Sequence, residues 1–235
     1  MSSASDLKFF STTAHQCSYL PDEQATTLFA DPKSSLDLHV YSELSDLGFR
    51  RSGNYIYRPH CGACRACVPV RIPVAQFKPN RQQKRVWSRN QDIEVVSREA
   101  GFDPEHYALY EEYIAHRHYD GDMYPPSVEQ YTSFLTSEWS QTTFFEFRLE
   151  GRLLAVSVCD WLENGLSAVY TFYAPEEQAR SLGTYAVLWQ IQECAVRGLH
   201  AVYLGYWIKQ CRKMSYKVAF RPIEVLVNSE WLLAR

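Results

Sequence analysis

Three of the seven cysteines, Cys61, Cys64 and Cys67, are spaced two residues apart in the segment YRPHCGACRACVPVR, residues 57–71. This spacing occurs in iron–sulfur proteins, and thiolates also suit zinc. Seven cysteines cannot all pair within one chain, and in a reducing compartment they are thiols, metal ligands or core residues. The alternative to a metal is that three small thiols pack a tight turn. In both cases we expect a scaffold, not a nucleophile.

The cationic residues are concentrated in two blocks that contain no acid. From Arg50 to Asn90 there are ten Lys or Arg residues and no Asp or Glu, and from Cys194 to Ile223 there are six, again without an acid. Either block alone is typical of a solvated face. Two such blocks, both rich in Tyr and Trp, favour a site that contacts a few phosphates of a polyanion. The net charge of −3 argues against tight general binding to nucleic acid.

The elements that must position these residues are clearest in the second half of the chain. In order, we predict helices at 104–118 and 126–139, strands on either side of a turn at 150–151 within 143–162, a strand at 165–175, a helix at 181–198, a strand at 200–208, a short helix at 210–220 and a strand at 221–227. Ser127 and Gln130 have capping-box spacing at the start of the second helix. This order is that of the acyltransferase fold of the GCN5-related N-acetyltransferases, as an analogy between folds.

The first half is predicted to mix helix and strand. Val40, Leu44 and Leu47 have helical spacing before Gly48, residues 53–59 form a strand, and the chain turns helical after Asn80. We therefore predict an α+β protein of two domains. A smaller N-terminal domain, residues 1–95, carries the cysteines, and an acyltransferase-like domain occupies residues 96–235.

In the acyltransferase fold a glycine-rich turn before the central helix binds the pyrophosphate of coenzyme A. Here the turn reads QARSLG, with Ser181 where the usual pattern has its first glycine, followed by Gly183. A side chain at residue 181 hinders close approach of the backbone to an anion. We therefore expect a different acyl donor, and an acyl-coenzyme A-dependent N-acyltransferase is the alternative.

Several stretches resemble the N-end-rule aminoacyl-tRNA–protein transferases, and together they cover nearly the whole chain. They are CSYLP (17–21), YRPHCGACRACVPVR (57–71), RHYDGDMYPP (117–126), YTFYAPEEQARSLGTYAVLWQI (170–191), YLGYWIKQCRKMSYK (203–217) and RPIE (221–224). The resemblance is greatest to the bacterial branch. It implies transfer of leucine from leucyl-tRNA to the N-terminal α-amine of proteins that begin with Asp or Glu, which marks them for degradation. Use of arginyl-tRNA is a second alternative.

The implied reaction sets requirements for the site. An aminoacyl ester is already activated, so the enzyme must hold an amine beside the ester carbonyl, remove a proton and stabilise the oxyanion. The catalytic candidates are Tyr206, Lys213 and Lys217. A guanidinium or ammonium is the natural reader of the acceptor carboxylate. The candidates for reading it are Arg58, Arg71, Arg212, Lys213, Lys217 and Arg221. The candidates for the remaining contacts to substrate are Arg117, His118, Asp120, Tyr170, Tyr173, Ser181, Gly183 and Tyr216. Tyr170 and Tyr173 are expected on one face of their strand.

The resemblance also bears on the cysteines. Because it brings CSYLP and HCGACRAC into one domain, Cys17 is the best fourth ligand beside Cys61, Cys64 and Cys67, and His60 is the alternative. Eukaryotic members are associated with an iron–sulfur cluster in this region, but their cysteine pattern differs, so the ligand set does not carry over whole. Transfer itself requires no cofactor, and an iron–sulfur cluster or zinc would be structural.

The chain lacks a run of about 18 apolar residues and an apolar signal core, so we expect no membrane partner and a cytoplasmic location. The expected partners are leucyl-tRNA and proteins or peptides with N-terminal Asp or Glu. A third possibility is a nucleic-acid-binding module with a structural metal and no catalysis. The order of strands and the KMSYK block, residues 213–217, argue against it.

Overall fold

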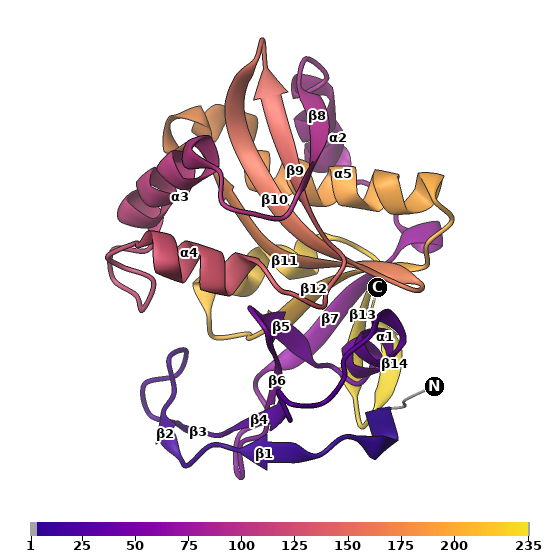
Figure 1. Cartoon of the computed structure of the whole chain (residues 1–235). Helices are drawn as coiled ribbons and strands as arrows, with labels where there is room; N and C mark the ends of the chain where they lie inside the picture. The colour runs from indigo at the N-terminus through magenta and orange to yellow at the C-terminus, as the bar shows by residue number, and fades with distance from the viewer. Residues whose placement is uncertain (1–3, 235) are drawn as a thin grey trace.

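A computed structural model describes residues 4–234 and shows a mixed α/β protein built on one large sheet (Figure 1). Its strands, in spatial order, are β14 (Glu230–Ala234), β13 (Ile223–Val227), β7 (Val68–Pro73), β12 (Ala201–Trp207), β11 (Gly165–Tyr173), β10 (Arg152–Leu162), β9 (Thr142–Leu149) and β8 (Glu94–Glu99). Neighbouring strands are antiparallel except β11 and β12, which are parallel. Strands β7 and β8 come from the first hundred residues, so both halves of the chain build this sheet.

Helices cover both faces of the large sheet (Figure 1). On one face lie α2 (Arg81–Arg89) and α5 (Leu182–Val196), whose Val86 and Leu188 belong to one core. On the other face lie α3 (Pro104–Arg117) and α4 (Val128–Leu135), whose Tyr110 and Tyr131 are fully buried. Short 3-10 helices connect the elements: η1 (Ala4–Asp6), η2 (Val74–Gln76), η3 (Pro175–Arg180) and η4 (Arg212–Ala219). Of these, η3 joins the end of β11 to the start of α5.

A smaller antiparallel sheet lies beside the large one. Its strands, in spatial order, are β1 (Phe9–Ser11), β4 (Thr27–Ala30), β6 (Tyr55–Pro59) and β5 (Arg50–Ser52), and a separate hairpin contains β2 (His15–Gln16) and β3 (Gln24–Ala25). Helix α1 (Leu38–Asp46) and this sheet share a core with the large sheet, in which Val40, Leu44, Ile56, Leu162 and Ala201 pack together. The small sheet is therefore held firmly against the large one.

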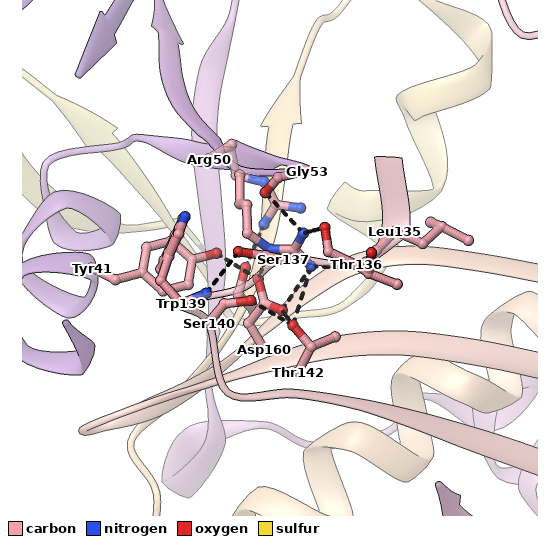
Figure 2. A network of polar contacts seen from close by, with 12 residues as sticks. Tyr41, Arg50, Gly53, Leu135, Thr136, Ser137, Trp139, Ser140, Thr142 and Asp160 are labelled. Carbon is pink, nitrogen blue, oxygen red and sulfur yellow. Dashed lines mark hydrogen bonds and ion pairs between the residues drawn. The ribbon is translucent and has the colours of Figure 1, made fainter. Parts of the chain in front are cut away.

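A buried ion pair fastens β5 to β10. Arg51 Nε and Nη2 donate to the two carboxylate oxygens of Asp160 at 2.7 and 2.9 Å, and neither side chain is exposed. Figure 2 shows that the hydroxyls of Tyr41 and Thr142 donate to the same carboxylate, at 2.8 and 2.7 Å. Charges removed from water are tolerated only when such additional hydrogen bonds are made. The network therefore holds β5 of the small sheet against β10 of the large sheet.

Most predicted elements are present. Helix α2 begins directly after Asn80, whose side chain forms a capping box with Gln83. Strands β9 and β10 meet at Glu150 and Gly151, both with positive φ. Helix α5 ends before Gly198, whose φ of 70° lies in the left-handed region that glycine tolerates.

Four details differ from the sequence-based predictions. Helix α4 ends at Leu135, not near 139, because Thr136 is extended. The capping box there is half formed, since the Gln130 side chain donates to Asp122 and not back to Ser127. The predicted helix at 210–220 is the 3-10 helix η4, and strands β1 to β5, β7, β8 and β14 were not predicted as strands. Strands β1 to β5 have only two to four residues each, and the charged residues of β8 give a weak strand pattern.

Candidate functional site

The two parallel strands β11 and β12 pair over only part of their length. Gly165–Ser167 pairs with Ala201–Tyr203, whereas β11 continues to Tyr173 and β12 to Trp207. Beyond the paired part the strands form a fork whose inner edges carry backbone groups without a ladder partner. Such a fork offers a bound molecule donors and acceptors from two strands.

Arg50 of β5 fills the start of this fork. Its guanidinium donates to Ser167 Oγ at 3.1 Å, to the Ala168 carbonyl oxygen at 2.5 Å and to the Tyr203 carbonyl oxygen at 3.4 Å. All three acceptors are neutral, and no ion pair within residues 4–234 involves Arg50. Sequence reasoning missed this residue, and its only signal was that it opens the first acid-free block. The fork therefore carries a positive charge that no carboxylate balances.

Lys217, a predicted site residue, reaches the same fork from η4. It is 8% exposed, and its Nζ donates to the carbonyl oxygen of Tyr206 at 2.6 Å. Burial, together with the nearby charge of Arg50, lowers the pKa of Lys217 to about 7. The Tyr206 hydroxyl donates away from the fork, to the Gly48 and Tyr57 carbonyl oxygens at 2.9 and 3.3 Å. At the fork, Lys217 therefore meets the backbone of Tyr206 and not its hydroxyl.

Tyrosines line the other side of the fork. The rings of Tyr170 and Tyr173 lie 6.3 and 4.9 Å from that of Tyr113 in α3, although residues three apart on a regular strand point to opposite faces. Arg117 lies over the Tyr173 ring at 6.0 Å. Tyr216 of η4 is 47% exposed, and the Nζ of Lys217 lies 6.0 Å from the centre of its ring. These side chains bring α3, β11 and η4 together around the fork.

His118 and Lys213 belong to the same neighbourhood. Burial lowers the pKa of His118, and the charges of Lys213 and Arg117 act in the same direction. Lys213 Nζ donates to Asp120 Oδ1 at 2.9 Å, and both side chains are more than half exposed. This pair joins η4 to the loop that follows α3. Lys213 is therefore partly neutralised at the surface, whereas Lys217 is buried.

Other predicted contact residues lie elsewhere. Arg71 is held by Glu224 at 2.6 Å and Asp46 at 2.8 Å, and it stacks on Trp231 at the far edge of the large sheet. Arg58 lies over the Phe49 ring and donates to the Leu47 carbonyl oxygen. Arg212 and Arg221 are exposed on or just beyond η4. Through these ion pairs Arg71 has a structural role, because it joins β7 to α1 and β13.

The turn before α5 combines a left-handed backbone at Ser181 with a close approach to β11 at Gly183. Ser181 has φ 54°, in the left-handed region, and its carbonyl oxygen accepts from the amides of Thr184 and Tyr185 at 3.0 Å each. A Cβ at Gly183 would lie 3.2 Å from Cε1 of Tyr173. The absence of a side chain at Gly183 therefore lets the first turn of α5 lie against the end of β11, next to the fork.

The four cysteines gather around one cavity of about 130 Å³. Cys17 follows β2, whereas Cys61, Cys64 and Cys67 lie between β6 and β7. Burial raises the pKa of Cys67 to about 12, with the Cys17 thiol adding to the effect. Within residues 4–234, no group of three or more His, Cys, Asp or Glu side chains is arranged to hold a metal ion. Metal binding stays a prediction, which metal analysis of anaerobically purified protein would check, and no step of the reaction is assigned to it.

The fork, the crossover through α5 and the cationic and tyrosine side chains around them form a place where an amine and an activated acyl group could meet. The family profile described as Arginine-tRNA-protein transferase, C terminus, matches residues 105–227, and that described as Arginine-tRNA-protein transferase, N terminus, matches residues 15–85. The chain belongs to this family of aminoacyltransferases, as its motifs predicted.

Curated relatives match the chain over its full length. Those named aspartate/glutamate leucyltransferase from Pseudomonas fluorescens (strain Pf0-1) and Stutzerimonas stutzeri (strain A1501) are each 60% identical, over 233 and 232 residues, and each comparison covers 99% of both chains. Among solved structures, L-PGS from Bacillus licheniformis has a TM-score of 0.47 and 13% identity, covering 86% of this chain and 68% of that one. Among residues 4–234, no helix combines the length and apolarity that a bilayer span requires.

Proposed function

We propose that this chain is a leucyltransferase that moves leucine from leucyl-tRNA to the N-terminal α-amine of proteins beginning with Asp or Glu, marking them for degradation in the cytoplasm. The observation that carries the proposal is the 60% identity, over 99% of both chains, to relatives named aspartate/glutamate leucyltransferase. The element order β9–β10–β11–α5–β12 with its fork supports an acyltransferase-like architecture. Ser181 in place of the first glycine of the phosphate turn supports a donor other than coenzyme A.

The fork supplies the groups that the reaction needs. The acceptor α-ammonium gives a proton to the neutral Nζ of Lys217, and the resulting amine attacks the ester carbonyl carbon of the aminoacyl group. The bond from that carbon to the ribose oxygen breaks, and the oxygen leaves as a hydroxyl with the second proton, which the attacking nitrogen gives up as it becomes an amide; the proton held by Lys217 then passes to water. A base is effective when its pKa is close to the working pH, and that of Lys217 is lowered to about 7. No covalent enzyme intermediate is required.

The acidic acceptor side chain is matched by charge at the fork. Arg50 and Arg117 take part in no ion pair among the described residues, so their charges are available to a carboxylate. A guanidinium binds a carboxylate with directed hydrogen bonds and stays charged at every working pH. We assign the reading of the acceptor carboxylate to these two arginines, in place of Lys217, whose Nζ is buried and used for the proton.

The test is a transfer assay with radiolabelled leucyl-tRNA and short peptides. Peptides beginning with Asp or Glu should be labelled, and otherwise identical peptides beginning with Lys or Ala should not. Equal labelling of all four would overturn the acceptor specificity. Faster transfer from arginyl-tRNA would assign a different aminoacyl donor, and transfer from acetyl-coenzyme A in place of leucyl-tRNA would overturn the tRNA-dependent function.

A further inference from the structure

Aromatic side chains form a row across the small sheet. Phe10 of β1 is directly opposite Phe29 of β4, Phe29 is opposite Tyr57 of β6, and Tyr57 is opposite Arg50 of β5. Residues directly opposite on neighbouring strands lie on the same face. Tyr55, two residues before Tyr57, lies on that face as well. We call these four rings, Phe10, Phe29, Tyr55 and Tyr57, the aromatic row.

The aromatic row is on one face of the sheet, with Phe10 and Tyr55 exposed and Phe29 and Tyr57 half-buried. The opposite face packs into the core through Phe9, Ala30 and Ile56. Phe10 and Tyr55 are each 54% exposed, although a one-sided antiparallel sheet normally presents polar side chains to water. Large exposed aromatic side chains that lie together mark a surface for binding.

Three of the four rings lie close enough to form one surface, and Phe10 extends it on the neighbouring strand. The ring centroids of Phe29 and Tyr55 are 6.2 Å apart, and those of Phe29 and Tyr57 are 6.0 Å apart. With strands about 4.8 Å apart, four strands span about 14 Å from the free edge at β1 to β5. The row therefore offers several ring faces or edges in sequence.

The row leads into the fork. The Tyr57 ring is 6.4 Å from the ring of Tyr206 in β12, and Arg50, the next residue across the sheet, is the one that fills the fork. In Figure 1, β5 is the strand of the small sheet that lies nearest β11 and β12, and β1 is farthest away. A chain-like ligand that follows the row from β1 would therefore end at the reactive position.

The charges of the small sheet favour an anionic ligand. Its four strands contain Arg50, Arg51 and Arg58 and no Asp or Glu. Arg51 is used by Asp160, and Arg58 points to the other face of the sheet. Arg50, whose partners are neutral, is therefore the cation on the face of the row. Aromatic rings on the face of a four-stranded sheet, together with arginine, are a recurring means of binding unpaired nucleotides, whose bases stack on the rings.

We infer that the aromatic row stacks the unpaired bases at the 3′ end of the aminoacyl-tRNA and so directs the terminal ribose ester into the fork. The inference rests on the proposed function, because it names how the donor of that reaction is held. Stacking tolerates any base, so the row contributes affinity and direction but no choice among tRNAs.

The test is tRNA binding by the double variant with Phe10→Ala and Tyr55→Ala, measured by fluorescence anisotropy with labelled, uncharged tRNA. Both side chains are mostly exposed, so folding should be preserved. The double variant should bind intact tRNA about tenfold more weakly. It should bind tRNA trimmed of its unpaired 3′ nucleotides as the unaltered protein does. Phe102→Ala, which removes an aromatic side chain of similar exposure (49%) near the start of α3, should change neither affinity.

Two conservative variants serve as controls, and three results would overturn the inference. Phe10→Tyr and Tyr55→Phe keep the rings and should keep the affinity for intact tRNA. Equal weakening on intact and trimmed tRNA, or no weakening at all, would overturn the inference. A raised KM for the acceptor peptide with unchanged tRNA affinity would assign the row to the peptide and would also overturn it. Because binding is measured without turnover, failure of leucine transfer by the unaltered protein would count against the proposed function alone.

Discussion

The guanidinium of Arg50 lies so close to Gly205 that a Cβ at residue 205 would be 3.0 Å from Arg50 Nε and 3.1 Å from Cζ. Gly205 has φ 76° and sits where the register between β12 and β7 shifts. The glycine therefore serves two purposes, since it permits a left-handed backbone in β12 and leaves room for the arginine that fills the fork.

Gly205→Ala should impair both stability and transfer. An alanine at this φ costs about 1–2 kcal/mol of unfolding free energy. Displacing Arg50 should misplace groups at the fork, which we expect to lower the transfer rate by about 100-fold. Gly151→Ala is the matched control, because Gly151 has φ 85° and no atom within 4 Å of its Cβ position. The control should lose similar stability in urea unfolding and keep its activity, and equal activities of the two variants would contradict the role of Arg50.

Lys217→Met should abolish the pH dependence that we assign to the base. Lys217 accepts a proton only when neutral, and its pKa is lowered to about 7, so the rate of the unaltered enzyme should rise from pH 6 to 8. The variant keeps most of the apolar stem and should be slow across this range. The measurement is leucine transfer to an Asp-starting peptide at saturating tRNA, and a variant with full activity would remove Lys217 from the mechanism.

Urea unfolding provides an independent readout for the same lysine. The folded pKa is lowered to about 7 from an ordinary value of about 10.4, so between these pH values the folded state binds fewer protons than the unfolded state. Stability from this group therefore increases as pH rises from 7 to 10, by at most about 1.4 kcal/mol per pH unit. The increase should be absent in Lys217→Met and retained in Lys33→Met, whose side chain is exposed.

Asp160→Asn should strongly destabilise the protein. It leaves the guanidinium of Arg51 buried without its charge partner, which costs about 3–5 kcal/mol in comparable sites. The exposed pair of Arg152 and Glu176 is the control, since Glu176→Gln should change the unfolding free energy by less than about 1 kcal/mol. Equal effects of the two substitutions in urea unfolding would show that the network of Figure 2 contributes little to stability.

Charge reversal on α2 should weaken tRNA binding. The exposed face of α2 carries Arg81, Lys84, Arg85 and Arg89, and none forms an ion pair among the described residues. Arg89 also donates to the Ala179 carbonyl oxygen in η3, so this face adjoins the turn before α5. Lys84→Glu with Arg85→Glu should reduce affinity and lower the slope of log K against log salt by about 2.

The control for the reversal on α2 uses distant exposed charges. Lys33→Glu with Arg152→Glu makes the same change in net charge on other surfaces. An equal loss of affinity in both double variants would indicate a general effect of net charge, and unchanged binding at low salt would exclude α2 from the tRNA surface. The measurement is binding of uncharged tRNA across a series of salt concentrations.

The sequence by itself determined the family and most of the elements, because both depend on local information. Asn80 caps α2 through the residues that follow it, Gly198 ends α5, and the turn at Glu150 and Gly151 sets the register of β9 and β10. These signals act over a few residues and can be read without knowing what packs against them. Lys217 was also found from sequence, because it lies in the family motif of the KMSYK block.

Only the tertiary structure decided how two adjacent arginines are used. Arg50 and Arg51 have the same chemistry and the same local context, yet Arg50 fills the fork while Arg51 is buried against Asp160. Alternation along β5 sends them to opposite faces, and which face meets which partner depends on contacts more than a hundred residues away in the chain. Lys217 and its neighbour Lys213 differ for the same reason, since burial against Tyr206 lowers the pKa of Lys217 while Lys213 stays at the surface beside Asp120.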